Sequence, residues 1–152
     1  RATRRRNMQA IRHKDTKPEI LVRKALFREG FRYRLHQKKL PGKPDLTFRK
    51  HNAVIQIHGC YWHFHGCHLS KVPETDTAWW LEKLQTTQMR DQRNRTALAE
   101  AGWRVCDVWE CALRGKNRWL LADVVSQLKN WLNSDLDYLE ISGERKNAGV
   151  SE

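Results

Sequence analysis

The sequence predicts an α/β domain in which helices flank a central mixed sheet. The 152 residues suit one domain with a hydrophobic core, and 39% of them are apolar. Helical and strand-like stretches follow one another in the order helix, hairpin, helix, strand, helix. The sequence shows no internal repeat and no linker that would separate a second folded domain. These observations favour a single sandwich of helices around a small sheet.

The first predicted helix begins after Thr16 and ends before Gly30. Thr16 can cap the helix, Pro18 fits its first turn, and Glu19 can complete a capping box. Gly30 is typical of the residue that follows a helix.

A hairpin is predicted next. The PGKP turn leads into a strand at residues 45–48, and a second turn at residues 51–52 leads into a strand at residues 53–57. Alternation places Gln56 and His58 on one face of the second strand and its isoleucines on the other.

The second half of the chain predicts a long helix, a strand and a last helix. The long helix spans residues 77–101, and its polar middle predicts a face turned to solvent or to a ligand. Gly102 ends it, a strand follows at residues 103–109, and Asn117 can cap the last helix, which reaches residue 132. We therefore expect a basic segment at residues 1–14, a folded domain at 15–132 and a loose polar tail at 133–152.

The charge of the chain favours a polyanionic partner. The formal net charge is +12, which points to nucleic acid. No apolar run approaches the roughly 18 residues that span a bilayer, so we expect no membrane partner. Without a visible secretory signal, four cysteines are more typical of a metal site in a reducing compartment than of two disulfides.

The segment HGCYWHFHGCH at residues 58–68 is the densest group of metal-ligating residues. Zinc takes four nitrogen or sulfur ligands in a tetrahedron. The preferred set on spacing is Cys60, His65, Cys67 and Cys111. On spacing alone His63 or His68 can replace His65, and Cys106 is better explained as a small core residue inside its strand.

A second constellation predicts phosphodiester cleavage. Asp45 begins a strand, where its carboxylate can hold a divalent cation, and His58 ends the next strand. His58 and His63 have the titration range of a general acid or base. Glu19 can support the same site, although its place in the capping box explains it equally well.

The chain resembles the very-short-patch-repair (Vsr) endonucleases. The resemblance rests on NMQAI, DTKPE, LPGKPD, HGCYWH, WLEKL and GWRVCDVWECALRG, in this order between about residues 4 and 114. It implies a restriction-endonuclease-like fold, Mg²⁺ chemistry and a structural zinc ion. It also implies nicking of one DNA strand 5′ to the thymine of a T:G mismatch, which arises when 5-methylcytosine is deaminated.

The same resemblance implies roles for individual residues. Asp45 and the backbone carbonyl of Ile57 would bind Mg²⁺, His58 and His63 would be catalytic, and Glu19 would support the site. Zinc would take the set preferred on spacing. The residues expected at the DNA are Tyr61, Trp62 and Trp80 as wedges beside the mismatch, with Trp79 as neighbour of the last, and Arg4, Arg5 and Arg6 at phosphates. Thr87 and Asp91 are expected to be neighbours of the site.

The expected partner is double-stranded DNA carrying a T:G mismatch. Mismatch-repair proteins are candidate partners, and we expect a monomer acting at the nucleoid in a bacterial cytoplasm. Two other functions compete with this one. A related restriction or mobile-element endonuclease would cut unmismatched DNA, and a zinc-stabilised DNA-binding module would not cut at all.

Overall fold

The computed structural model describes residues 14–60, residue 65 and residues 74–143. The following residues with predicted roles lie outside this part of the chain: Arg4, Arg5, Arg6, Tyr61, Trp62, His63 and Cys67. Their predicted roles are untested by the fold.

Within the described residues, five strands form one mixed sheet in the order β1-β2-β3-β4-β5. The strands are β1 (Arg34–Leu35), β2 (Leu46–Phe48), β3 (Ala53–His58), β4 (Arg104–Trp109) and β5 (Tyr138–Ile141). The pairs β1–β2 and β2–β3 are antiparallel, whereas β3–β4 and β4–β5 are parallel. The predicted mixed sheet flanked by helices is therefore confirmed.

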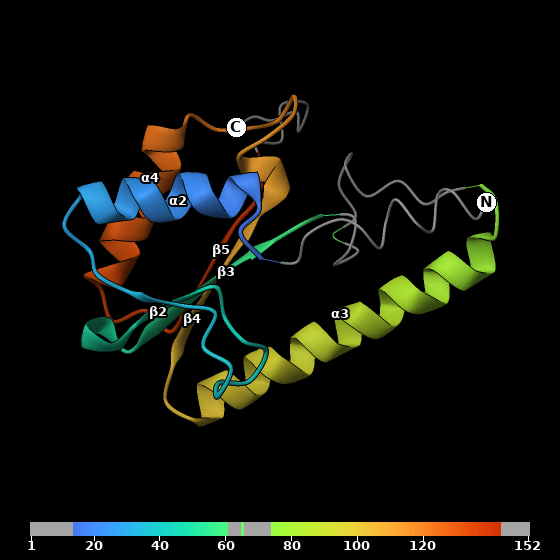
Figure 1. The fold of residues 1–152 in the computed structure, drawn as a ribbon, viewed down its shortest axis with the longest axis horizontal. Helices are drawn as coiled ribbons and strands as arrows, with labels where there is room; N and C mark the ends of the chain where they lie inside the picture. The colour runs from blue at the N-terminus through green and yellow to red at the C-terminus, as the bar shows by residue number, and fades with distance from the viewer. Residues whose placement is uncertain (1–13, 61–64, 66–73, 144–152) are drawn as a thin grey trace.

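Helices cover both faces of this sheet (Figure 1). On one side lie α2 (Lys17–Arg28) and α4 (Leu121–Leu132), and on the other lies α3 (Thr77–Glu100). The main core lies under α2 and α4, where Leu26 and Leu128 pack on Ile55 and Val108 of the sheet. Among the residues that the structure describes, no helix has the length and apolar character needed to span a bilayer.

The beginning of α2 agrees with its sequence. The Thr16 side chain accepts a hydrogen bond from the Glu19 N–H at 3.4 Å, which satisfies one exposed donor of the first turn. The Glu19 carboxylate accepts from the Asp15 N–H at 2.9 Å, one residue earlier than a standard capping box. After the helix ends, Gly30 adopts φ +98°, a conformation that favours glycine.

The predicted hairpin is β2 and β3. Between them, residues 49–51 form a short 3-10 turn and Asn52 adopts φ +51°. Ala53 and Ile55 of β3 join the core under α2 and α4. Alternation therefore turns Gln56 and His58 toward the α3 side of the sheet, where the candidate site lies.

The crossover through α3 makes β3 and β4 parallel neighbours. The helix ends at Glu100, and Gly102 adopts φ +93° before β4 begins. The first residue of β4, Arg104, donates hydrogen bonds to the carbonyls of His51, Trp131, Leu132 and Leu136. This side chain joins the sheet to the end of α4, far along the strand from His58.

Two predictions for the C-terminal third are wrong. Residues 133–152 were expected to be a loose tail, but Tyr138–Ile141 forms β5 and pairs with β4 along its length. Asn117 was expected to cap the last helix, but α4 begins at Leu121 after Leu120, without a side-chain cap.

Candidate active site and metal centre

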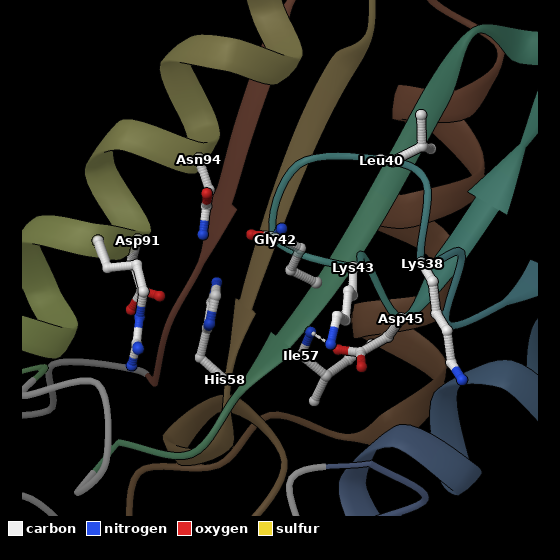
Figure 2. A pocket seen from close by; sticks show the side chains of 11 residues that line it. Lys38, Leu40, Gly42, Lys43, Asp45, Ile57, His58, Asp91 and Asn94 are labelled. Atoms are coloured by element: carbon white, nitrogen blue, oxygen red, sulfur yellow. Dashed lines mark hydrogen bonds between the residues drawn. The ribbon is translucent and has the colours of Figure 1, made fainter.

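A cleft of about 520 Å³ lies between the sheet and α3. The turn before β2 and the middle of α3 form its walls, and Asp45, just before β2, and the end of β3 form its floor (Figure 2). The residues that line it are Lys38, Leu40, Gly42, Lys43, Asp45, Gln56, Ile57, His58, Arg90, Asp91 and Asn94. Three of the predicted site residues, Asp45, Ile57 and His58, thus share one cleft with the basic side chains of Lys38, Lys43 and Arg90.

Asp45 is held in this cleft by the backbone of the neighbouring strand. Its Oδ2 accepts a hydrogen bond from the Ile57 N–H at 2.8 Å, and its side chain is 14% exposed (Figure 2). Burial raises the pKa of Asp45 to about 7. The hydrogen bond from Ile57 lowers this pKa and the charge on Glu19 raises it, so the hydrogen bond offsets only part of the effect of burial. A bound cation would stabilise this carboxylate, so the residue fits a divalent metal ligand.

Glu19 faces the same region from α2. Its Oε2 lies 2.7 Å from Arg23 Nη1 and 2.8 Å from His36 Nε2. His36 in turn lies 3.9 Å from Asp45 Oδ1. Glu19 therefore takes part in the helix start and is linked to Asp45 through His36, whereas its role in the site stays a prediction. Arg23 also pairs with Asp15 at 2.7 Å, so the Arg23 guanidinium already neutralises charge on Asp15 and Glu19.

His58 ends β3 and is held from β4. Its Nε2 lies 2.6 Å from Oδ1 of Asp107, and its ring packs on Trp109 with ring centroids 4.7 Å apart. Burial would lower the pKa of His58, but the hydrogen bond to Asp107 and the charge of Asp107 outweigh it and raise the pKa above the usual value. His58 is 5% exposed and is one of the residues that line the cleft.

Asp107 is fully buried in the middle of β4 and is surrounded by hydrogen-bond donors. Besides His58, Arg95 Nε of α3 donates to its Oδ2 at 2.7 Å and the Tyr138 hydroxyl of β5 at 2.8 Å. Burial would raise the pKa of Asp107, but the hydrogen bond from His58 and the charges of His58 and Arg95 lower it to about 2.

This low pKa predicts a loss of stability in acid. The pKa of Asp107 falls from 3.8 to about 2 on folding, so the carboxylate stabilises the fold above pH 4 and loses that effect as the pH falls toward 2. The loss is about 2 kcal/mol in the free energy of unfolding. Denaturant unfolding of the wild type and of Asp107→Asn at several pH values checks this. A variant with the same pH dependence as the wild type would contradict it.

The predicted metal ligands Cys60, His65 and Cys111 come together beyond the ends of β3 and β4. Their candidate ligand atoms all lie within 4.8 Å of one another. His65 Nδ1 lies 3.5 Å from Cys60 Sγ and 3.6 Å from Cys111 Sγ. A tetrahedral zinc ion with ordinary bond lengths separates its sulfur and nitrogen ligands by about 3.5 Å. The geometry therefore supplies three corners of such a site, and the predicted fourth ligand, Cys67, lies outside the described residues.

The backbone around this centre suits thiolate ligands. The Cys111 N–H donates to Cys60 Sγ at 3.3 Å, and the Gly143 N–H donates to Cys111 Sγ at 3.2 Å. Hydrogen bonding with Cys60 lowers the pKa of Cys111 to about 4, against burial, which raises it. A Cβ at Gly143 would lie 2.7 Å from the Cys111 carbonyl oxygen, so this approach requires glycine.

Trp109 connects the metal centre to the cleft. Its ring stacks on His65 with centroids 4.0 Å apart and an interplanar angle of 6°, and it also contacts His58. Its Nε1 donates to Glu140 of β5 at 2.8 Å. The histidine of the metal centre and the histidine of the cleft therefore pack on the same side chain.

The remaining predicted residues fall in different places. Asp91 lines the cleft, whereas the Thr87 hydroxyl bonds the Lys83 carbonyl at 3.2 Å inside α3. Trp80 is 2% exposed and Trp79 is 38% exposed, so insertion of Trp80 into DNA requires its side chain to leave this packing. The role of Trp80 stays a prediction.

Among the residues that the sequence did not predict are four that hold the site from neighbouring elements: His36, Arg95, Asp107 and Tyr138. Asp107 carried a usable signal, because it is an acidic residue in the interior of an otherwise apolar strand, where a charge needs a partner. No spacing pattern marked the other three, since they reach the site through the fold.

Comparison with known proteins adds an independent observation. The family model described as DNA mismatch endonuclease Vsr matches residues 1–69. The chain is 42% identical over 132 residues to the DNA mismatch endonuclease Vsr of Escherichia coli, which covers 87% of this chain and 85% of the relative. It is 46% identical over 106 residues to the type II nicking enzyme V.XorIIP of Xanthomonas oryzae, covering 70% of this chain and 78% of the relative. It is also 47% identical over 109 residues to the type II nicking enzyme V.NmeAIP of Neisseria meningitidis, covering 72% and 78%.

Proposed function

Because the chain belongs to the DNA mismatch endonuclease Vsr family, we propose that it nicks one DNA strand on the 5′ side of the thymine in a T:G mismatch. As a member of this family it is a DNA endonuclease, a hydrolase of phosphodiester bonds, and DNA is its partner. The mismatch is the one left by deamination of 5-methylcytosine, and the nick initiates very short patch repair. The single observation that carries the proposal is the cleft that Asp45, Ile57 and His58 share with basic side chains.

We assign the divalent metal of this nuclease family to Mg²⁺ at the floor of the cleft. Asp45 and the backbone carbonyl of Ile57 would hold it, with Glu19 and His36 supporting Asp45 from the side of α2. The ion, when bound, polarises the scissile phosphate. Lys38, Lys43 and Arg90 line the cleft and attract the phosphate backbone.

His58 and His63 are the proposed acid and base. Hydrolysis takes a proton from the attacking water and gives one to the leaving oxygen, and two histidines can exchange these protons near neutral pH. The contacts with Asp107 and Trp109 support this role for His58, because they hold its ring at the cleft. The role of His63 rests on the sequence motif.

The proposed zinc site stabilises the loop that begins after β3. Cys60, His65, Cys67 and Cys111 would fill all four positions of the ion, so it would have no open position for catalysis. These ligands would join the loop to the region after β4 through the metal. Tyr61 and Trp62 lie within the loop in sequence, and we propose that they enter the base stack with Trp80.

Mismatch selectivity follows from this wedge. Separating two stacked base pairs costs a few kcal/mol, and a mismatched step is easier to open than a matched one. The basic residues Arg4, Arg5 and Arg6 would add contacts to phosphates, which strengthen binding to any DNA sequence. We further propose a restriction-endonuclease-like fold, action as a monomer at the bacterial nucleoid in the cytoplasm, and mismatch-repair proteins as partners.

A nicking assay tests the proposed function. The protein is incubated with Mg²⁺ and with duplexes that differ only in a T:G or C:G pair, placed in several cytosine methyltransferase recognition sequences. We expect one-strand cleavage of the T:G duplex alone, which chelation of Mg²⁺ prevents. Cleavage of both strands of the C:G duplex would favour a restriction or mobile-element endonuclease. Binding without cleavage would reduce the function to a DNA-binding module.

A further inference from the structure

The strands behind the cleft carry a polar row that the proposed chemistry does not use. Gln56 and Asp107 are directly opposite each other on β3 and β4, and Asp107 and Glu140 on β4 and β5. The interior of a parallel sheet is usually apolar. A buried carboxylate at the centre of this row therefore needs a physical reason.

The donors around Asp107 show how the charge is kept there. Each oxygen is bound: Oδ1 by His58 Nε2, and Oδ2 by both Arg95 Nε and the Tyr138 hydroxyl. The three donors come from β3, α3 and β5, so three separate elements fix the carboxylate on every side. A carboxylate held in this way has one orientation, and it imposes that orientation on its partners.

His58 is the partner on which this orientation acts. Nε2 faces a carboxylate oxygen at 2.6 Å and therefore carries a proton, and Trp109 packs against the ring at 4.7 Å between centroids. Figure 2 shows the His58 side chain reaching from β3 toward α3, where Asp91 and Asn94 lie. Rotation of the ring would break the hydrogen bond to Asp107 and the contact with Trp109 together.

We infer that Asp107 is a positioning residue of the nicking reaction, held by Arg95 and Tyr138, which fixes the ring of His58 with its proton on Nε2. A carboxylate that orients a histidine in this way sets the tautomer and the direction of proton transfer without touching the substrate. The inference rests on the proposed function, since it concerns a histidine assigned to catalysis.

The test uses Asp107→Asn, which keeps the size of the side chain. The substitution removes the negative charge and replaces one carboxylate oxygen with an NH₂ group, which cannot accept a hydrogen bond. We expect the single-turnover nicking rate at saturating protein to fall by about 10- to 100-fold, with the Kd for the T:G duplex unchanged. Ring ¹⁵N NMR in alkaline solution, where the imidazole is neutral, should show the fixed Nε2–H form in the wild type and a mixture of tautomers in Asp107→Asn. The His58 signals are assigned by their loss in His58→Asn.

Two further variants separate positioning from folding. Tyr138→Phe removes one hydroxyl from Asp107 and should slow nicking about threefold to tenfold, with a smaller change in the His58 signals. Arg104→Lys weakens the carbonyl contacts at the opposite end of β4 and should lower Tm while nicking and the His58 signals stay as in the wild type.

The outcomes decide the inference. An Asp107→Asn protein with the wild-type rate and the wild-type His58 signals overturns it. If the nicking rate, the affinity for DNA and Tm all fall while the His58 signals stay unchanged, the inference is also overturned and Asp107 has a structural role. If Asp107→Asn does not fold, Tyr138→Phe decides by the same two readouts. If the wild type nicks no T:G duplex, the proposed function fails, and the ring signals still show whether Asp107 positions His58.

Discussion

Asp45→Ala is expected to lower the rate of T:G nicking by about a thousandfold or more while the protein still binds DNA. Asp45 is a carboxylate of the cleft floor, and its Oδ2 is fixed by the Ile57 N–H at 2.8 Å. Removing a metal ligand removes most of the several kcal/mol that a bound ion contributes to transition-state stabilisation. About 4 kcal/mol corresponds to a factor of about a thousand in rate. Binding should be retained or slightly tighter, because one negative charge leaves a basic surface.

Single-turnover nicking and a DNA-binding titration measure the two effects separately. Asp123→Ala is the matched control, since it removes an exposed carboxylate from α4 on the other side of the sheet. It should nick at the wild-type rate. An Asp45→Ala protein that nicks at a rate near that of the wild type would show that the metal is held elsewhere.

Cys111→Ser is expected to release the metal of the second centre and to destabilise the whole domain. Cys111 joins the region after β4 to Cys60 and His65 after β3. A structural metal contributes directly to the free energy of folding, because the unfolded chain does not present the ligands together. A loss of about 3 kcal/mol lowers Tm by about 10 °C for a chain of this size.

The measurements are the zinc content of the purified protein and its Tm. Cys106→Ala is the matched control: Cys106 is also a buried thiol, but it packs in the apolar core under α2 and α4. We expect one zinc ion per chain in the wild type and in Cys106→Ala, and none in Cys111→Ser. Retention of stoichiometric zinc by Cys111→Ser, with an unchanged Tm, would remove Cys111 from the ligand set.

Most elements could be predicted because their signals are local. The capping residues around Thr16, the turn at Asn52 and the glycine after α3 each act on their immediate neighbours, and the structure has a boundary at each. The alternation in β3 also predicted correctly that Gln56 and His58 share a face. Three of the proposed zinc ligands meet as the cysteine and histidine spacing predicts.

The failures concern residues whose conformation depends on distant partners. β5 has four residues, two of them exposed, so its own pattern is weak, and pairing with β4 is what makes it a strand. Asn117 is a good cap in isolation, but the chain turns further before α4 begins. His36 enters the site through φ +46°, which no neighbouring residue predicts. Local preference yields to tertiary contacts at each of these positions.

Strand β5 has a consequence for the order in which the two centres are completed during synthesis. Tyr138 completes the donors around Asp107, and Gly143 approaches Cys111 directly after the strand. A nascent chain that has reached only the end of α4 already contains Asp45, His58, Cys60 and Cys111, yet it lacks the last partner of both centres. An unfinished polypeptide therefore carries these residues before the contacts of Tyr138 and Gly143 can form.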